Sequence, residues 1–190
     1  FYDANEKEIL HCCGGTMQDI ACIDDSNVPD SVRQSTFTIA CDVDTPFCGS
    51  EGAAPVFAPQ KGADAAMVQQ LDAGMVSLAK VIEDKYRINI VPIAGAGAAG
   101  GMGGAFCAFL HATLKRGIDM VLDAIDFNAI IQGADLIITG EGKIDFQTAK
   151  GKTAAGILAR AKQQDIPVVA IGGCVEMCDS VQYMGFAEIR

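Results

Sequence analysis

The fold is decided by the stretch GADLIITGEGKID at residues 133–145 and by its counterpart IPVVAI at residues 166–171. Within them, Asp135–Thr139 and Pro167–Ile171 are short apolar runs typical of buried strands. Lys152–Gln163, between the two runs, carries apolar residues at helical spacing and predicts a helix. A strand, a helix and a strand in succession predict two parallel neighbours in one sheet, joined by a crossover helix. The sequence is therefore of the α/β class.

Upstream of these stretches the sequence mixes helical and strand patterns. We expect a hairpin over Phe1–Leu10, a strand over Ser35–Cys41, a helix from the N-cap Asp64 to about Lys85, a strand over Ile88–Ile93, a helix over Ala105–Lys115 and one or two short helices over Ile118–Ile131. The helix after Asp64 has the clearest apolar stripe, because apolar residues recur there every three or four positions. The pattern changes near residues 128–134, where we expect the domain boundary.

Composition excludes several classes of protein. Half of the 190 residues are apolar and 20% are charged, which rules out wholesale disorder. The formal charge of −10 argues against nucleic acid or an anionic membrane surface as a partner. Residues 88–114 lack Asp, Glu, Lys and Arg, but six glycines between Gly95 and Gly104 argue against a membrane-spanning helix.

Eight cysteines raise the question of disulfides or zinc. None forms a CxxC pair, and the two histidines, His11 and His111, are far apart in the sequence. Several cysteines, such as Cys41 and Cys107, lie within apolar runs, where a free thiol packs as a small hydrophobic group. We therefore expect reduced, mostly buried thiols in a cytoplasmic protein, without a structural disulfide or a zinc site.

The glycine-rich stretch GAGAAG at residues 95–100 matches the GxGxxG pattern. A dinucleotide site also needs a second strand that ends in an acid about 20 residues later. Asp119 and Asp123 lie at that distance, but no strand is predicted before them. Two interpretations remain: a tight structural turn, or a turn whose backbone N–H groups hold an anion. For the second, the candidate residues are Gly95, Gly97, Gly100 and Gly101.

Acidic and basic residues follow the predicted strands. Asp42 and Asp44 come after the strand at residues 35–41, and Lys61 precedes the helix that Asp64 caps. Paired carboxylates after a strand suit metal binding or proton abstraction from an alcohol, and a lysine beside a helix start suits an anion. Ordinary turn chemistry is the alternative for each group taken alone.

A second polar group follows the strand at residues 135–139. It contains Glu141 and Asp145, then Lys150 and Lys152. Ligands of open α/β sheets bind beyond the carboxyl ends of strands, where acids can hold magnesium and lysines can meet phosphate. A solvated, charge-balanced loop is the alternative. Together, the two groups and the glycine loop predict an enzyme that acts on a small phosphorylated molecule.

Four motifs carry a family resemblance. They are CDVDTP at residues 41–46; GAA at 52–54 with Phe57 and PQKGA at 59–63; GAGAAGGMG at 95–103; and GADLIITGEG at 133–142 with Asp145, Gln147-Thr148 and Gly151-Lys152. In this order and spacing they resemble the bacterial type I glycerate kinases, over essentially the whole chain. The resemblance implies ATP-dependent phosphorylation of D-glycerate, foremost at the 2-hydroxyl, with Mg²⁺.

The resemblance also implies a domain organisation. Residues 1–128 correspond to a mixed α/β domain with the glycine-rich loop, and residues 129–190 to part of a flavodoxin-like parallel-sheet domain. The chain then represents a fragment that lacks the N-terminal and C-terminal parts of the family. We expect a small-molecule substrate, no nucleic-acid or membrane partner, and we allow for a homodimer.

The candidate residues have the following expected roles. Asp42, Asp44 and Lys61 are the catalytic candidates, and either aspartate could hold Mg²⁺ or accept the hydroxyl proton. Glu141, Asp145 and Lys152 join the glycine loop as candidates for binding substrate or phosphate. We expect Glu141 and Asp145 to face the same cleft as the glycine loop.

Two other classes of function remain open. One is a nucleotide- or dinucleotide-dependent oxidoreductase that uses the glycine loop, and an acid at the end of a second strand would favour it. The other is a catalytically inactive binding fragment, whose signature would be folding and self-association without turnover.

Overall fold

The structure is a computed structural model that describes residues 1–149 and 151–190. Contacts divide it into two compact units, Phe1–Leu114 and Lys115–Arg190. The boundary between the units lies before the one expected after residue 128, because α5 (Gly117–Ala124) and α6 (Phe127–Ile130) pack against α8 (Thr153–Lys162). Arg160 on α8 also donates to Asp123 on α5 at 2.6 Å.

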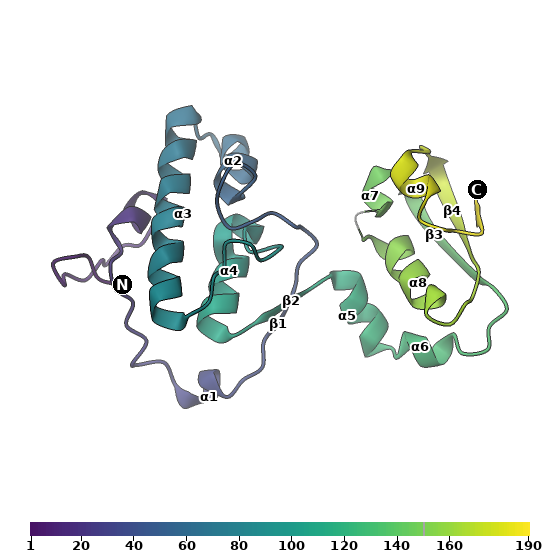
Figure 1. The fold of residues 1–190 in the computed structure, drawn as a ribbon, viewed down its shortest axis with the longest axis horizontal. Helices are drawn as coiled ribbons and strands as arrows, with labels where there is room; N and C mark the ends of the chain where they lie inside the picture. Colours follow the sequence, from purple (N-terminus) through teal and green to yellow (C-terminus); the bar gives the residue numbers. More distant parts are fainter. Residues whose placement is uncertain (150) are drawn as a thin grey trace. The chain divides into compact units, whose positions relative to one another are not determined.

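The first unit is built around the long helix α3 (Ala65–Tyr86). Against it pack η1 (Gly14–Asp19), α2 (Ala53–Phe57) and α4 (Ala98–Leu110) (Figure 1). The predicted cap is confirmed, since Asp64 Oδ1 accepts a hydrogen bond from the Met67 N–H at 2.8 Å. Met75, Ala79 and Ile82 form the buried stripe of α3 and pack with Ile90 and Ala108 into the core of this unit.

Smaller elements complete the first unit. They are α1 (Asp30–Arg33), the 3₁₀ turn η2 (Pro59–Lys61) and the paired short strands β1 (Thr38–Ala40) and β2 (Thr113–Lys115). The strand predicted over residues 35–41 is therefore confirmed in its centre. The predicted N-terminal hairpin is reduced to an antiparallel bridge between Tyr2 and Glu8.

Two predictions for residues 88–115 are wrong. Ile88–Ile93 forms no strand. The helix α3 ends at Tyr86, its C-cap residue Arg87 has a φ of 59°, and Asn89 Oδ1 then accepts a hydrogen bond from the Val91 N–H at 3.0 Å. Ile90 is fully buried in this turn, so the apolar run fills the core without pairing in a sheet. The helix predicted to reach Lys115 ends at Leu110, because His111 adopts a left-handed conformation and the following residues pair with β1.

The second unit contains a parallel sheet in the order β3 (Ile137–Ile144), β4 (Val168–Val175) and β5 (Glu188–Ile189). The helix α8 connects β3 to β4 and packs on both strands (Figure 1). The predicted parallel pair is thus confirmed, with Ile137 opposite Val168. The short helices α7 (Phe146–Ala149) and α9 (Asp179–Gln182) contact each other.

The strand β3 is longer than predicted. Pairing with β4 continues from Ile137 to Ile144, so residues 140–144 belong to the sheet and do not form the polar loop expected there. The fully buried Ile144 explains the extension, because it packs with Ala170 and Val181 in the core of this unit. Glu141 and Asp145 are therefore held at a sheet edge instead of a loose loop.

All eight cysteines are free thiols, but the expectation that most of them are buried is wrong. Cys48 and Cys107 are buried in the first unit, whereas Cys12, Cys13, Cys22 and Cys174 are exposed. The first three of the exposed cysteines lie in the irregular N-terminal segment, which offers little core. Among the helices of the described residues, none has both the length and the apolar character needed to cross a membrane.

Candidate functional site

The glycine-rich stretch forms the start of α4 and is tightly folded. Ala99, Gly100 and Gly101 have φ values of 52°, 78° and 104°, which interrupt the helix directly after its first residue, Ala98. The N–H groups of Gly100 and Gly101 both donate to the Gly97 carbonyl at 3.1 Å, and the Gly97 N–H donates to Thr45 at 2.9 Å. These groups are used within the fold, so an anion at this loop needs charge from a side chain nearby.

The segment with the two aspartates lies directly against this loop. A Cβ atom on Gly95 would stand 2.6 Å from Cys41 Sγ and 2.9 Å from the Val43 carbonyl oxygen. A Cβ atom on Gly97 would stand 2.2 Å from the Pro46 carbonyl oxygen. Only glycine permits this approach, and it places the exposed Asp42 and Asp44 beside the loop. The structure therefore packs the segment that carries the aspartates against the glycines.

Lys61 reaches the same loop from another side. Lys61 and Gly100 both line a cavity of about 240 Å³, whose other described walls are apolar or glycine and include Phe57, Leu71 and Met75. Among the described residues of this lining, Lys61 alone is charged. A cavity of this size with one cationic group suits a small anion with a short carbon skeleton. Asp42 and Asp44 do not line it.

In the second unit, Glu141 and Asp145 are joined through a third residue. Thr148 is fully buried, and its hydroxyl donates to Glu141 Oε1 and accepts from the Asp145 N–H at 3.2 Å. Asp145 Oδ1 accepts from the Gln147 N–H at 2.8 Å, and this bond, together with the nearby Lys143, lowers the pKa of Asp145. Both acids are therefore fixed in position, Glu141 within β3 and Asp145 directly after it.

Two basic residues, Lys143 and Lys152, also belong to this polar group. Lys152 donates to Gln147 Oε1 at 2.6 Å, and Lys143 pairs with Glu176 at 2.9 Å. The bond to Glu176 raises the pKa of Lys143. The sequence reasoning missed Thr148 as a connector and Glu176 as a member of the group. Glu176 follows β4 as Asp145 follows β3, so the rule for carboxyl ends of parallel strands could have found it. Lys150 lies outside the described residues.

The carboxylate donors present suit Mg²⁺ that is shared with substrate phosphates, and they do not suit a metal ion held by protein ligands alone. Among residues 1–149 and 151–190, no three His, Cys, Asp or Glu side chains gather into a metal site. Magnesium, however, is commonly held by one or two carboxylates together with substrate phosphates. Asp42 and Asp44 supply such a pair. That Glu141 and Asp145 face the same cleft as the glycine loop stays a prediction.

The features that a dinucleotide-dependent oxidoreductase needs are not found around the glycine loop in the described residues. The acids at the required distance from the glycine loop, Asp119 and Asp123, lie on the helix α5. Their partners are basic, since Asp119 pairs with Arg116 at 2.7 Å and Asp123 pairs with Arg160 at 2.6 Å. The residues directly before the loop form turns and no strand.

We expect the Thr148→Val variant to lower the free energy of unfolding by about 1–3 kcal/mol, the cost of leaving buried hydrogen-bonding groups unpaired. Valine preserves the shape but removes the hydroxyl that serves both Glu141 and the Asp145 N–H. Thermal unfolding followed by circular dichroism measures the change. Thr148→Ser keeps the hydroxyl and should recover most of the loss. Equal stability of the valine variant and the original chain would contradict the bridging role.

Comparison with known proteins gives consistent matches. The model of the family described as "Glycerate kinase family" matches residues 1–190. The chain is 45% identical over 170 residues to the glycerate kinase of Bacillus subtilis strain 168, covering 90% of this chain and 44% of that protein. It is 41% identical over 171 residues to the glycerate 2-kinase of Escherichia coli K12, covering 90% and 45%.

A solved structure has the same fold over the whole chain. It is the crystal structure of a protein provisionally named glycerate kinase 2 from Salmonella typhimurium LT2, with a TM-score of 0.79 and 38% identity. The match covers 100% of this chain and 49% of that one. The chain thus spans about half the length of the proteins that it matches.

Proposed function

Because the chain belongs to the glycerate kinase family, we propose that it forms part of an ATP-dependent kinase that phosphorylates D-glycerate, foremost at the 2-hydroxyl. The names of the relatives support the substrate, and the Escherichia coli relative is named for the 2-position. One structural observation carries the proposal: the segment that contains the two aspartates packs against the glycine loop on one side, and a cavity lined by Lys61 adjoins the loop on another. The free thiols fit the cytoplasmic location expected above.

In this proposal Lys61 binds the substrate anion. D-Glycerate is a three-carbon carboxylate, and the cavity of about 240 Å³ offers apolar walls and one ammonium group. The ammonium would pair with the carboxylate or with the phosphoryl group in transfer. Phosphoryl transfer depends on positioning and charge neutralisation more than on covalent participation of the protein, which is what this arrangement offers.

Asp42 and Asp44 are proposed to act where the 2-hydroxyl of the substrate reacts. One carboxylate would accept the proton that the 2-hydroxyl loses as its oxygen attacks the γ-phosphorus, with ADP as the leaving group. The other would hold Mg²⁺, which neutralises charge on the phosphates when it is bound. Their position beside the glycine loop supports both roles.

In the second unit, Glu141, Asp145 and Lys152 are proposed to contact substrate or phosphate. Asp145 lies at the carboxyl end of β3, where ligands collect in parallel α/β sheets, and Glu141 is linked to it through Thr148. Thr148 holds the two acids in place, which is the rigidity that a binding group needs.

An assay of ADP release coupled to NADH oxidation tests the proposal, with D-glycerate, ATP and Mg²⁺. It is applied to this chain and to the complete protein that its gene encodes. We expect release that depends on D-glycerate, and 2-phosphoglycerate as the product identified by NMR. Formation of the 3-phosphate alone would overturn the position of transfer. A folded complete protein without glycerate-dependent release would overturn the function.

A further inference from the structure

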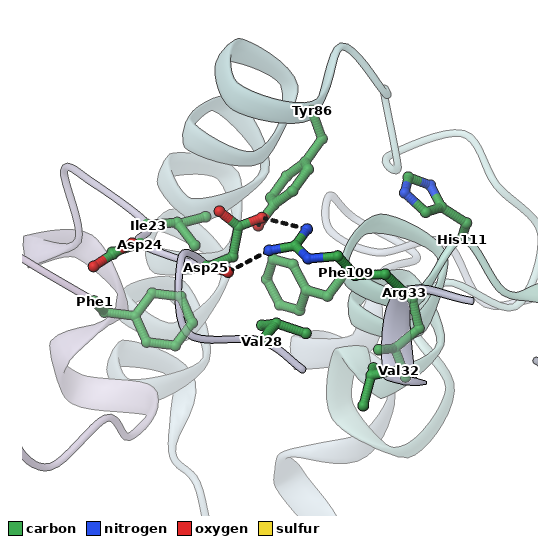
Figure 2. Close-up of a pocket in the computed structure, with 11 residues that line it drawn as sticks. Phe1, Ile23, Asp24, Asp25, Val28, Val32, Arg33, Tyr86, Phe109 and His111 are labelled. Atoms are coloured by element: carbon green, nitrogen blue, oxygen red, sulfur yellow. Dashed lines mark hydrogen bonds and ion pairs between the residues drawn. The ribbon is translucent and has the colours of Figure 1, made fainter. Parts of the chain in front are cut away.

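A second cavity, of about 460 Å³, opens at the opposite end of α4 from the glycine loop. Figure 2 shows that its lining comes from four segments far apart in the sequence: Phe1, the stretch before and within α1, the end of α3 and the end of α4. The volume lies within the range of pockets that hold small organic ligands. None of the residues predicted as catalytic or binding lines it.

The walls of this cavity are largely aromatic. The rings of Tyr86 and Phe109 meet edge to face with their centroids 5.6 Å apart, and the Phe1 ring lies 6.3 Å from Phe109. Ile23, Val28 and Val32 add aliphatic surface. Aromatic faces and edges presented together favour a flat, aromatic ligand that can stack on one ring and meet the edge of another.

The charged groups at the cavity are already paired. Asp25 accepts from Lys85 at 2.8 Å and from the Tyr86 hydroxyl at 3.1 Å, and the Arg33 guanidinium donates to the Asp25 carbonyl at 2.6 Å. The Lys85 bond lowers the pKa of Asp25, while burial and the bond to Asp25 raise the pKa of Tyr86 to about 12. The lining carries Asp24, Asp25 and Arg33, and Lys85 beside it pairs with Asp25, so the local charge balances and a phosphate or an ammonium ligand gains little here.

One polar side chain at the rim is available for a ligand. His111 follows α4, and although its backbone N–H donates to the Phe106 carbonyl, its imidazole makes no hydrogen bond to any residue that the structure describes. In Figure 2 its imidazole stands across the view from Phe1, with the Tyr86 and Phe109 rings between them. A neutral imidazole offers one donor and one acceptor, which match the edge of a heteroaromatic ring.

We propose that this cavity, walled by Tyr86 and Phe109 with His111 at its rim, binds a neutral, planar heteroaromatic ring of nucleobase type. The ring could belong to a free nucleoside or to ATP, and the probes below separate these sources. The cavity is distinct from the glycine-loop site, because the two lie at opposite ends of α4. The 13 residues of this helix span at most roughly 20 Å. The proposal does not depend on the kinase function.

The test is a titration of the chain with adenosine, followed by the amide NMR signals of Leu110 and Ala112. We expect saturable shifts, and at least tenfold weaker binding for Val32→Trp, which fills the cavity. The control Val76→Trp places the same ring at an exposed position of α3 outside the cavity and should bind as the original chain does. Adenosine that causes no saturable shift overturns the proposal.

A second pair of variants avoids any risk to folding. His111→Gly removes the imidazole at a left-handed position that glycine favours, and it should weaken adenosine binding about fivefold. Arg87→Gly makes the same change at the left-handed end of α3, outside the cavity, and should leave binding unchanged. Equal weakening by both variants would overturn the role of His111.

ATP with Mg²⁺ and inorganic phosphate complete the titrations. Displacement of adenosine by ATP from the same residues identifies the ring as that of the nucleotide donor, whereas adenosine binding that ATP leaves intact identifies a separate nucleoside site. Phosphate alone should shift none of the cavity signals. Displacement of adenosine by phosphate would contradict the balance of charge described above and overturn the proposal.

Discussion

Gly97→Ala is expected to destabilise the first unit by about 3 kcal/mol or more, the upper range for forcing an atom into a packed interior. The added methyl would stand 2.2 Å from the Pro46 carbonyl oxygen and 3.0 Å from Thr45 Cγ2. A backbone oxygen cannot rotate away as a flexible side chain can. Relief therefore requires separating the loop from the aspartate segment, which would also break the hydrogen bond from the Gly97 N–H to Thr45.

Thermal unfolding provides the measurement, and two other glycines provide controls. We expect Gly97→Ala to lower the melting temperature by about 10 °C or more. Gly100→Ala meets no atom within 4 Å but keeps a φ of 78°, so only its conformational strain of about 1 kcal/mol should appear. Gly142→Ala also meets open space, without a positive φ, and should be neutral. The same loss for Gly97→Ala and Gly100→Ala would show that the close approach is not the cause.

Lys61→Ala should reduce kcat/KM for D-glycerate by about 30- to 1000-fold, the effect of removing one charge contact worth about 2–4 kcal/mol in the transition state. Lys61 supplies the sole charge on the described lining of its cavity, so no neighbour there can replace it. The loss should be larger than that of a lysine outside the cavity, because Lys61 is the residue proposed to pair with the substrate anion. This prediction depends on the proposed function.

Steady-state kinetics on the complete protein give the result, with folding checked by circular dichroism. The matched control is Lys80→Ala, which removes an exposed lysine from α3 and should leave turnover unchanged. Asp44→Asn is the companion variant beside the glycine loop and should also lower kcat. If Lys61→Ala and Asp44→Asn both keep normal kcat and KM for glycerate, the residues serve only the local turns and the proposed site is wrong.

The parts of the fold that the sequence predicts are those with a local cause. The apolar stripe and the Asp64 cap define α3, and two buried apolar runs around a helix define the pair β3–β4. The error at Ile88–Ile93 has a physical reason: a short apolar run is equally suited to a strand and to a buried turn. There the left-handed Arg87 and the side chain of Asn89 decide for the turn. The short strand at Thr113–Lys115 depends on its distant partner β1.

The candidate site residues stay a prediction. The sequence singled out Asp42, Asp44, Glu141 and Asp145 because each follows an expected strand, but in the structure Glu141 lies within β3, and it is the segment containing the first two that packs against the glycine loop. Thr148 was missed because its role depends on full burial between two acids, which no spacing rule encodes. The cavity of Tyr86 and Phe109 was missed because its walls meet only through tertiary packing.

The tightness of the glycine loop has a consequence for ligand binding. Six glycines in ten residues would be among the most mobile stretches of an unfolded chain, yet here they are held by contacts with residues 41–46 and by hydrogen bonds across the turn. Their loss of conformational entropy occurs when the protein folds and not when a ligand arrives. A preorganised loop of this kind leaves more of the interaction free energy available for affinity.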